Sequence, residues 1–379
     1  VVVKEGYTVI NYNVIMADTF GRADIFTKMI PGAPNEYRYD DDALIRRECR
    51  GIIFDTATGD IIRRPFHKFF NVNEREETLD RAIDLSRPNA ILEKLDGSMI
   101  APFIVDGKMI WGTKMGATPV AEPVEDFVVN NPQYVSFAND AIENGWTPIF
   151  EWCSRKQRIV LDYIDDQLIL TAMRNIRTGQ YAPYGNLVAI GQAYAIPVVR
   201  AFDPRTDIKE LIAFVADLTD TEGFIVRFDD GHMVKLKCDW YVDIHRAKEK
   251  ILQDRNIVEI ILDERLDDLK AHLLDEDRDR LTVFENDFNA AILGVVDNIV
   301  TEAVDLDQRK VDRKTFAIEI APNYHPLVRA ILFGLWDVDA IGHDVVRAKV
   351  YATIRSHLGK TVKYEVVRDL WFPNVKFNV

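Results

Sequence analysis

Lys94 is the residue of this sequence best placed to act as a nucleophile. It follows the apolar pair Ile91-Leu92 and Glu93, and the turn-forming pair Asp96-Gly97 comes two residues after it. Most lysines lie in solvent, but apolar neighbours and a tight turn would hold this amine in one position. A lysine that is fixed and partly shielded from water can lose its proton near neutral pH and attack an electrophile.

Carboxylates and further lysines follow at strand-like positions downstream. Glu151 comes at the end of an apolar run, and Glu222 opens another apolar run. Lys235 and Lys237 are two residues apart, so both side chains would lie on the same face of a strand. A nucleophilic lysine would therefore have both acids and cations available as neighbours.

These residue types suit attack on a nucleoside triphosphate. The cations would favour a neutral nucleophile and would neutralise charge on the α-phosphate and the leaving pyrophosphate. The carboxylates would hold a hydrated Mg²⁺ or a ribose hydroxyl. An aromatic ring such as Phe70, in the basic stretch from Arg63 to Asn71, would stack on the base.

Length and composition predict a two-domain globular protein. The 379 residues exceed one ordinary core, and 47% hydrophobic with 28% charged residues is typical of globular domains. The net charge of −14 argues against a broadly basic nucleic-acid coat but permits a local basic groove. Three widely spaced cysteines predict a reduced, intracellular protein without structural zinc. We expect no membrane partner, because no apolar stretch spans a bilayer and the first residues are not a secretory signal.

Turn signals organise the first part of the chain. Strands are predicted on both sides of three turns: Thr58-Gly59, Asp106-Gly107 and Asp230-Gly231. A further strand is predicted at 168–173, helices at about 119–131 and 207–218, and loops at Pro31-Gly32 and Asp40-Asp41-Asp42. This pattern predicts an α+β domain with antiparallel sheets and flanking helices.

The pattern changes near residue 245. Beyond it Asp-Gly turns end, and apolar residues recur at helical spacing, which predicts helices at 283–304, 325–336 and 343–358. The stretch 363–379 is ambiguous. We therefore expect a β-rich domain over residues 1–244 and an all-helical domain over residues 245–379.

The ordered motifs resemble those of the covalent lysyl-nucleotidyltransferase superfamily, and most closely those of the phage T4 RNA ligase 1 family. The motifs are Lys94-Leu95-Asp96-Gly97, Glu151, Glu222-Gly223 and Lys235-Leu236-Lys237. Supporting stretches are Cys49–Phe54, Arg64–Asn71, Gly112–Lys114, Arg158–Val160 and Glu264–Leu269. The resemblance covers about residues 45–270 and identifies residues 1–244 as a nucleotidyltransferase (adenylyltransferase) domain.

The resemblance implies an ATP-dependent RNA ligase that joins 5′-phosphate and 3′-hydroxyl RNA ends with the help of Mg²⁺ or Mn²⁺. Lys94 would take AMP from ATP, AMP would pass to the 5′-phosphate of an RNA, and a 3′-hydroxyl would displace it. The family further implies RNA or tRNA repair, with cleaved tRNA as a substrate. It also implies a monomer encoded by a bacteriophage and acting in the cytoplasm of the host cell.

The resemblance also assigns roles to single residues. Lys94 is the nucleophile, while Lys235 and Lys237 bind the α-phosphate and orient the leaving group. The implied ATP contacts are Arg50, Lys68, Phe70, Gly97, Lys114, Glu151, Glu222, Lys235, Lys237 and Tyr241. The implied metal ligands, acting through water, are Glu151, Glu222 and Asp267.

Two other kinds of function remain open from the sequence. Another polynucleotide ligase or a GTP-using capping enzyme would share these motifs, but such enzymes usually carry an oligonucleotide-binding β-barrel where a long helical pattern follows here. A non-catalytic RNA-binding protein on the same scaffold is the alternative of another class. Lys-x-Asp-Gly and Lys-x-Lys are each weak signals alone. The ligase interpretation depends on finding all of the motifs together and in the required order.

Overall fold

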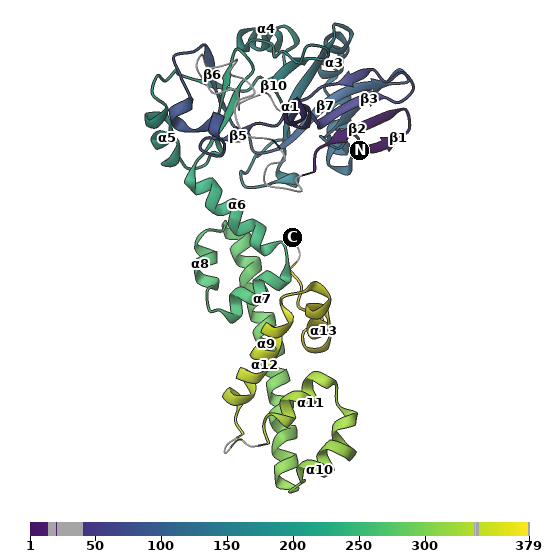
Figure 1. Ribbon diagram of the computed structural model, residues 1–379, viewed down its shortest axis with the longest axis vertical. Coiled ribbons are helices and arrows are strands. Elements are labelled where there is room, and N and C mark those ends of the chain that lie inside the picture. The colour runs from purple at the N-terminus through teal and green to yellow at the C-terminus, as the bar shows by residue number, and fades with distance from the viewer. Residues whose placement is uncertain (14–19, 21–40, 337, 339–340, 378–379) are drawn as a thin grey trace. The chain divides into compact units, whose positions relative to one another are not determined.

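The computed structural model describes residues 1–13, 20, 41–336, 338 and 341–377. The chain divides into two units, Val1–Val242 and Asp243–Val379, of which the first is rich in strands and the second helical (Figure 1). The division falls inside helix α6 (Asp239–Ile251), two residues before the boundary predicted from the sequence. The loop predicted at Pro31-Gly32 lies outside the described residues.

Three sheets form the framework of the first unit. The first sheet, in the order β1-β2-β3-β4, contains Val2–Lys4, Tyr7–Asn11, Arg50–Asp55 and Ile61–Arg63. The second, β10-β9-β7-β8, contains Gln167–Asn175, Trp146–Cys153, Ser98–Val105 and Lys108–Gly112. The third, β11-β6-β12-β13-β5, contains Ala201–Phe202, Asn89–Glu93, Gly223–Phe228, Met233–Lys237 and Phe70–Asn71. The predicted α+β class is confirmed, and the short pairing of β13 with β5 is the parallel exception among these strands.

The three predicted hairpins are confirmed as β3–β4, β7–β8 and β12–β13. The β7–β8 turn shows why, since Asp106 and Gly107 both have positive φ, 50° and 73°. A turn of this kind has the twist that antiparallel strands need. Strand β10 covers the strand predicted at 168–173, whereas the β1–β2 hairpin was not predicted.

Helices in the first unit follow the predictions in part. Helices α2 (Glu122–Val129) and α5 (Ile208–Ala216) match the predicted segments, and Asp207 caps α5 by accepting two backbone N–H groups. Helices α3 (Pro132–Glu143) and α4 (Tyr184–Tyr194) were not predicted. Helix α1 spans Asp41–Glu48, so the predicted loop is wrong for Asp41 and Asp42, while Asp40 lies outside the described residues. Aspartates favour helix starts as well as loops.

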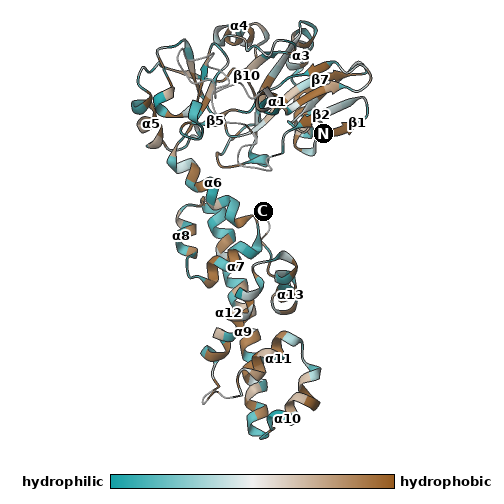
Figure 2. Cartoon of the chain, viewed as in Figure 1, coloured by the Kyte–Doolittle hydropathy of each residue, from teal (hydrophilic) through white to brown (hydrophobic). Residues whose placement is uncertain are grey.

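The described residues of the second unit form helices and their connections only. Their bounds are Asp254–Leu262 (α7), Leu266–Ala271 (α8), Asp275–Gln308 (α9), Arg313–Thr315 (α10), Pro326–Phe333 (α11), His343–His357 (α12) and Thr361–Trp371 (α13). Helix α9 buries residues at helical spacing, including Leu281, Phe284, Phe288, Ile292 and Val296. Apolar and polar residues alternate along it in Figure 2. Within the described ranges, no helix is long and apolar enough to cross a membrane.

A buried arginine joins the first sheet to the second. Arg63 on β4 is fully buried, and its guanidinium donates hydrogen bonds to the backbone carbonyls of Gly51, Ala101, Gly112 and Thr113 at 2.9–3.2 Å. A guanidinium offers five N–H donors and no acceptor, so it can join several strands at once. This arginine therefore fixes the start of β3 against the β7–β8 hairpin.

Candidate active site

The segment that carries Lys94 crosses from one sheet to another. Strand β6 belongs to the third sheet and β7 to the second, and Lys94–Gly97 connects them. The backbone N–H of Lys94 donates to the carbonyl of Gly223 at 2.9 Å. Gly97 lies so close to β9 that a Cβ there would be 2.3 Å from the carbonyl oxygen of Trp152. The predicted tight turn is thus a crossing that holds Lys94 between the two sheets.

Asp96 anchors this crossing. Its carboxylate is buried and accepts the N–H groups of Val160 and Leu161, both at 2.7 Å, and the hydroxyl of Tyr241 at 2.6 Å. Its own N–H donates to the hydroxyl of Tyr163 at 3.0 Å. Since a buried carboxylate needs such donors, Asp96 positions the neighbouring nucleophile and has its oxygens occupied by the protein.

Tyr241 contacts both the Lys94 segment and the lysine pair. Its hydroxyl donates to Asp96 and the amine of Lys237 lies 5.0 Å from its ring centre, while its implied contact with ATP stays a prediction. Burial, followed by the charge of Glu222 and the bond to Asp96, raises the pKa of Tyr241. Tyr241 therefore remains a protonated donor that braces the Lys94 segment.

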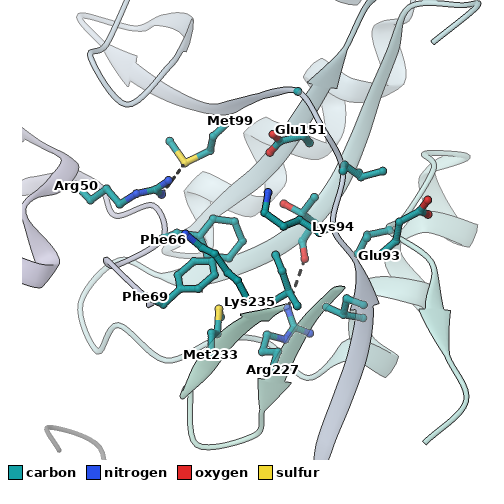
Figure 3. Close-up of a pocket in the computed structure, with 16 residues that line it drawn as sticks. Arg50, Phe66, Phe69, Glu93, Lys94, Met99, Glu151, Arg227, Met233 and Lys235 are labelled. Carbon is teal, nitrogen blue, oxygen red and sulfur yellow. Dashed lines mark hydrogen bonds between the residues drawn. The ribbon is translucent and has the colours of Figure 1, made fainter. Parts of the chain in front are cut away.

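A cavity of about 240 Å³ lies beside Lys94 (Figure 3). Five of the predicted site residues line it: Arg50, Lys94, Gly97, Glu151 and Lys235. The remaining lining is Phe66, Phe69, Leu92, Glu93, Leu95, Met99, Thr171, Val199, Ile225, Arg227 and Met233. A wall that combines apolar side chains with convergent charged groups is typical of sites for small polar molecules. We call it the Lys94 cavity.

Glu222 links two of the lysines. It is 3% exposed, and its Oε1 lies 2.7 Å from Nζ of Lys94 and 2.9 Å from Nζ of Lys237. The sequence predicted cations around the nucleophile and did not predict this ion pair. Because an amine attacks only as the free base, Lys94 must leave the ion pair and lose a proton before it can react.

Two groups of the Lys94 cavity titrate near neutral pH. Burial, together with the charges of Lys68 and Lys94, lowers the pKa of Lys235 to about 7. Burial raises the pKa of Glu151 to about 7, an effect that Lys94 opposes and Glu222 increases. Perturbed groups that gather in one cavity are typical of functional sites.

The aromatic rings of the cavity are Phe66 and Phe69, as Figure 3 shows. Phe70 is 2% exposed and packs against the amine of Lys68, 4.9 Å from its ring centre. Successive residues of an extended segment point to opposite sides, so the residue after Phe69 faces away. The contact of Phe70 with the base stays a prediction, and Phe69 is the ring of this pair that lines the cavity.

Seven predicted site residues are not among those that line the cavity: Lys68, Phe70, Lys114, Glu222, Lys237, Tyr241 and Asp267. Burial lowers the pKa of Lys68, as do the charges of Arg50, Arg75 and Lys114, whereas the charge of Glu74 raises it. Lys114 is exposed just after β8. Asp267 belongs to α8 in the second unit, and its role as a metal ligand stays a prediction.

Arg227 and Thr171 line the cavity without having been predicted. The signal for Arg227 was an arginine within Gly223–Phe228, a strand that is otherwise apolar. Residues 223, 225 and 227 share one face of this strand, and Ile225 also lines the cavity. Nothing local in the sequence distinguished Thr171.

The family model of RNA ligases of the T4 RNA ligase 1 type matches residues 48–241, about half of the chain. The chain belongs to this RNA ligase family. The match spans every motif from Arg50 to Tyr241, so the resemblance drawn from those motifs is confirmed.

Relatives and solved structures extend the comparison. A Thermovibrio ammonificans protein, provisionally named an RNA ligase, is 32% identical over 241 residues, 61% of this chain and 62% of the relative. RNA ligase 1 of bacteriophage TS2126 is 28% identical over 260 residues, 65% of this chain and 64% of that protein. The chain thus matches less than two thirds of the length of either relative. An archaeal ATP-dependent RNA ligase overlaps 53% of this chain and 55% of its own, at 15% identity and a TM-score of 0.40, too partial an overlap for further inference.

Proposed function

We propose that this protein is an ATP-dependent RNA ligase that joins a 5′-phosphate to a 3′-hydroxyl. The observation that carries the proposal is the place of Lys94, whose amine lies in the cavity with Lys235 and Glu151. It is held there by the buried Asp96, in a chain of the RNA ligase family.

In the first step, Nζ of Lys94 forms a bond to the α-phosphorus of ATP, and the bond to pyrophosphate breaks. Lys235 and Lys237 contact the α-phosphate and the leaving pyrophosphate, where they neutralise the developing charge. The cations Arg50, Lys68 and Lys114 contact the outer phosphates or the ribose. AMP then passes to the RNA 5′-phosphate, and the 3′-hydroxyl displaces it to seal the strand.

A divalent cation fits the carboxylates of this site. Among the described residues, no group of three or more His, Cys, Asp or Glu side chains could hold a metal. Mg²⁺, however, is commonly held through water by one or two carboxylates together with substrate phosphates, and Glu151 and Glu222 supply two. When bound, Mg²⁺ or Mn²⁺ would neutralise charge on the phosphates. Asp267 is proposed as an outer ligand.

The RNA itself is proposed from the family. We propose repair of broken RNA, with cleaved tRNA as one substrate, by a monomer in the cytoplasm of a phage-infected cell. The helical second unit would contribute to choosing the RNA. With the full chain, a faster sealing of a nicked tRNA than of an unstructured oligonucleotide would support the tRNA assignment, and equal rates would contradict it.

The ligase activity is tested with 5′-phosphorylated RNA, Mg²⁺ and either ATP or GTP. We expect RNA-adenylate and sealed RNA with ATP alone, and no sealing of DNA ends at comparable rates. Nucleotide transfer from GTP alone would indicate a capping-type enzyme, and RNA binding without any adduct would indicate a non-catalytic protein. The helices that follow α6 favour an RNA ligase over a capping enzyme, because capping enzymes usually carry a β-barrel at this position in the chain.

A further inference from the structure

The Lys94 cavity contains a buried hydrogen-bond donor that the proposed chemistry does not use. Arg227 is 5% exposed and lines the cavity. Its Nη1 donates to the carbonyl of Thr171 at a long 3.5 Å, while Nη2 is buried and has no hydrogen-bond partner among the described residues. A buried N–H without an acceptor is costly, so this group is suited to a ligand that supplies one.

Thr171 is exposed to the cavity by an irregularity in β10. The pairing of β10 with β9 shifts register between Leu170 and Ala172, which leaves Thr171 out of the ladder. Its side chain is fixed, since its hydroxyl donates to the carbonyl of Ile149 at 2.9 Å. Bulges of this kind redirect groups at active sites. Here the bulge places a backbone carbonyl beside Arg227.

Arg227 occupies one end of the Lys94 cavity. In Figure 3, Arg227 and Met233 lie at one end of the cavity, while Met99 and Glu151 lie at the other. The lining residues next to Arg227 on strands β12 and β13, Ile225 and Met233, are apolar, as expected for the part that holds a base.

We infer that Arg227, together with the carbonyl of Thr171, determines the choice of adenine over guanine. Nη2 donates to N1 or N7, the ring nitrogens on either side of the 6-amino group of adenine, and the carbonyl accepts from that amino group. Guanine carries the acceptor O6 in place of the amino group, with the acceptor N7 on one side and the N1–H donor on the other. The carbonyl of Thr171 would face O6 of guanine, and neither of these two oxygens could donate. This inference rests on the proposed use of ATP in this cavity.

The test measures kcat/KM for the formation of the lysyl-nucleotide adduct by the full chain. Wild type and Arg227→Met are compared with ATP, GTP, 1-deaza-ATP, 7-deaza-ATP and 3-deaza-ATP. We expect Arg227→Met to reduce kcat/KM for ATP by about 10- to 100-fold, mainly through KM, and to reduce the preference for ATP over GTP similarly. Arg205→Met, which removes an exposed arginine of the same unit, should leave both unchanged.

The analogues decide whether Arg227 reads the base. With the wild type, either 1-deaza-ATP or 7-deaza-ATP should show a kcat/KM as low as that of Arg227→Met with ATP. For that analogue, the substitution Arg227→Met should lower kcat/KM little further. 3-Deaza-ATP, altered on the far side of the ring, should behave as ATP. An equal loss for ATP, GTP and every analogue would overturn the inference and leave Arg227 a structural residue.

Two controls keep the result interpretable. Thermal unfolding shows whether Arg227→Met is folded, and Arg227→Lys, which keeps the charge, should recover only part of the ATP preference. If the wild type binds adenine nucleotides without forming an adduct, the proposed function fails. The same comparison of dissociation constants then still supports or overturns the role of Arg227.

Discussion

Nucleotide binding should change the protonation of Lys235 more than that of any other group in the site. Its pKa in the free protein is about 7 because of burial and the charges of Lys68 and Lys94. At pH 8 only about a tenth of the molecules therefore carry the proton on Lys235. A phosphate placed against this amine favours the ammonium form, so binding at pH 8 should take up about 0.9 proton per site.

The sign of the proton exchange should depend on pH. Near pH 6 Lys235 is already protonated and takes up little. Glu151, with a pKa of about 7, acts in the opposite sense, since ionising it beside a bound ribose or cation releases a proton below pH 7. Net uptake should therefore be positive at pH 8 and smaller or negative at pH 6. Between pH 8 and 9 the affinity should fall by nearly tenfold.

Isothermal titration calorimetry with α,β-methylene ATP, which cannot adenylylate the protein, measures this uptake from the heats in buffers of different ionisation enthalpy. Lys235→Met is the matched control, because it removes the amine and keeps an apolar side chain of similar length. The nucleotide's own phosphates contribute equally to both proteins. Wild type should exceed the variant by about 0.9 proton at pH 8 and by little at pH 6. If wild type and Lys235→Met took up the same number of protons at pH 8, or if their dissociation constants depended on pH in the same way, the lowered pKa of Lys235 would be refuted.

Three substitutions test the framework around Lys94. Tyr241→Phe removes the hydrogen bond to Asp96 and should lower the free energy of unfolding by about 1.5–3 kcal/mol in urea titrations; an unchanged value would mean that this bond is not formed in solution. Gly97→Ala places a Cβ 2.3 Å from a backbone oxygen of β9 and should abolish adenylylation, whereas Gly185→Ala, which meets nothing within 4 Å, should not; equal activities of the two variants would contradict the close approach. Glu222→Gln keeps the shape but loses the charge that is proposed to hold the hydrated cation on the phosphates and that pairs with Lys237, so adenylylation should fall at least about 100-fold with the fold retained; unfolding of this variant by circular dichroism would instead show a structural role.

Local patterns predicted the strands and the order of the site residues well. Asp-Gly pairs determine hairpins over a few residues, and strand alternation places Lys235 and Lys237 on one face without any tertiary information. These rules suffice for β7–β8 and β12–β13. The motif spacing then led to the residues that line the cavity, since Lys94, Glu151 and Lys235 meet there.

Long-range contacts explain what the sequence analysis missed. Phe69, and not Phe70, faces the cavity because β5 pairs with β13, where Phe70 lies opposite Val234. The role of Tyr241 depends on a bond to Asp96, 145 residues away in the chain. The bulge that exposes Thr171 is likewise set by the pairing of two strands. None of these partners is visible from local sequence.

The central claim is that Lys94 is the residue that accepts AMP. The most direct measurement is peptide mass spectrometry of the full chain after incubation with ATP and Mg²⁺. The account predicts a single AMP on the peptide containing Lys94, and no adduct on Lys94→Ala. An adduct on another residue, such as Lys235 or Lys237, would contradict it.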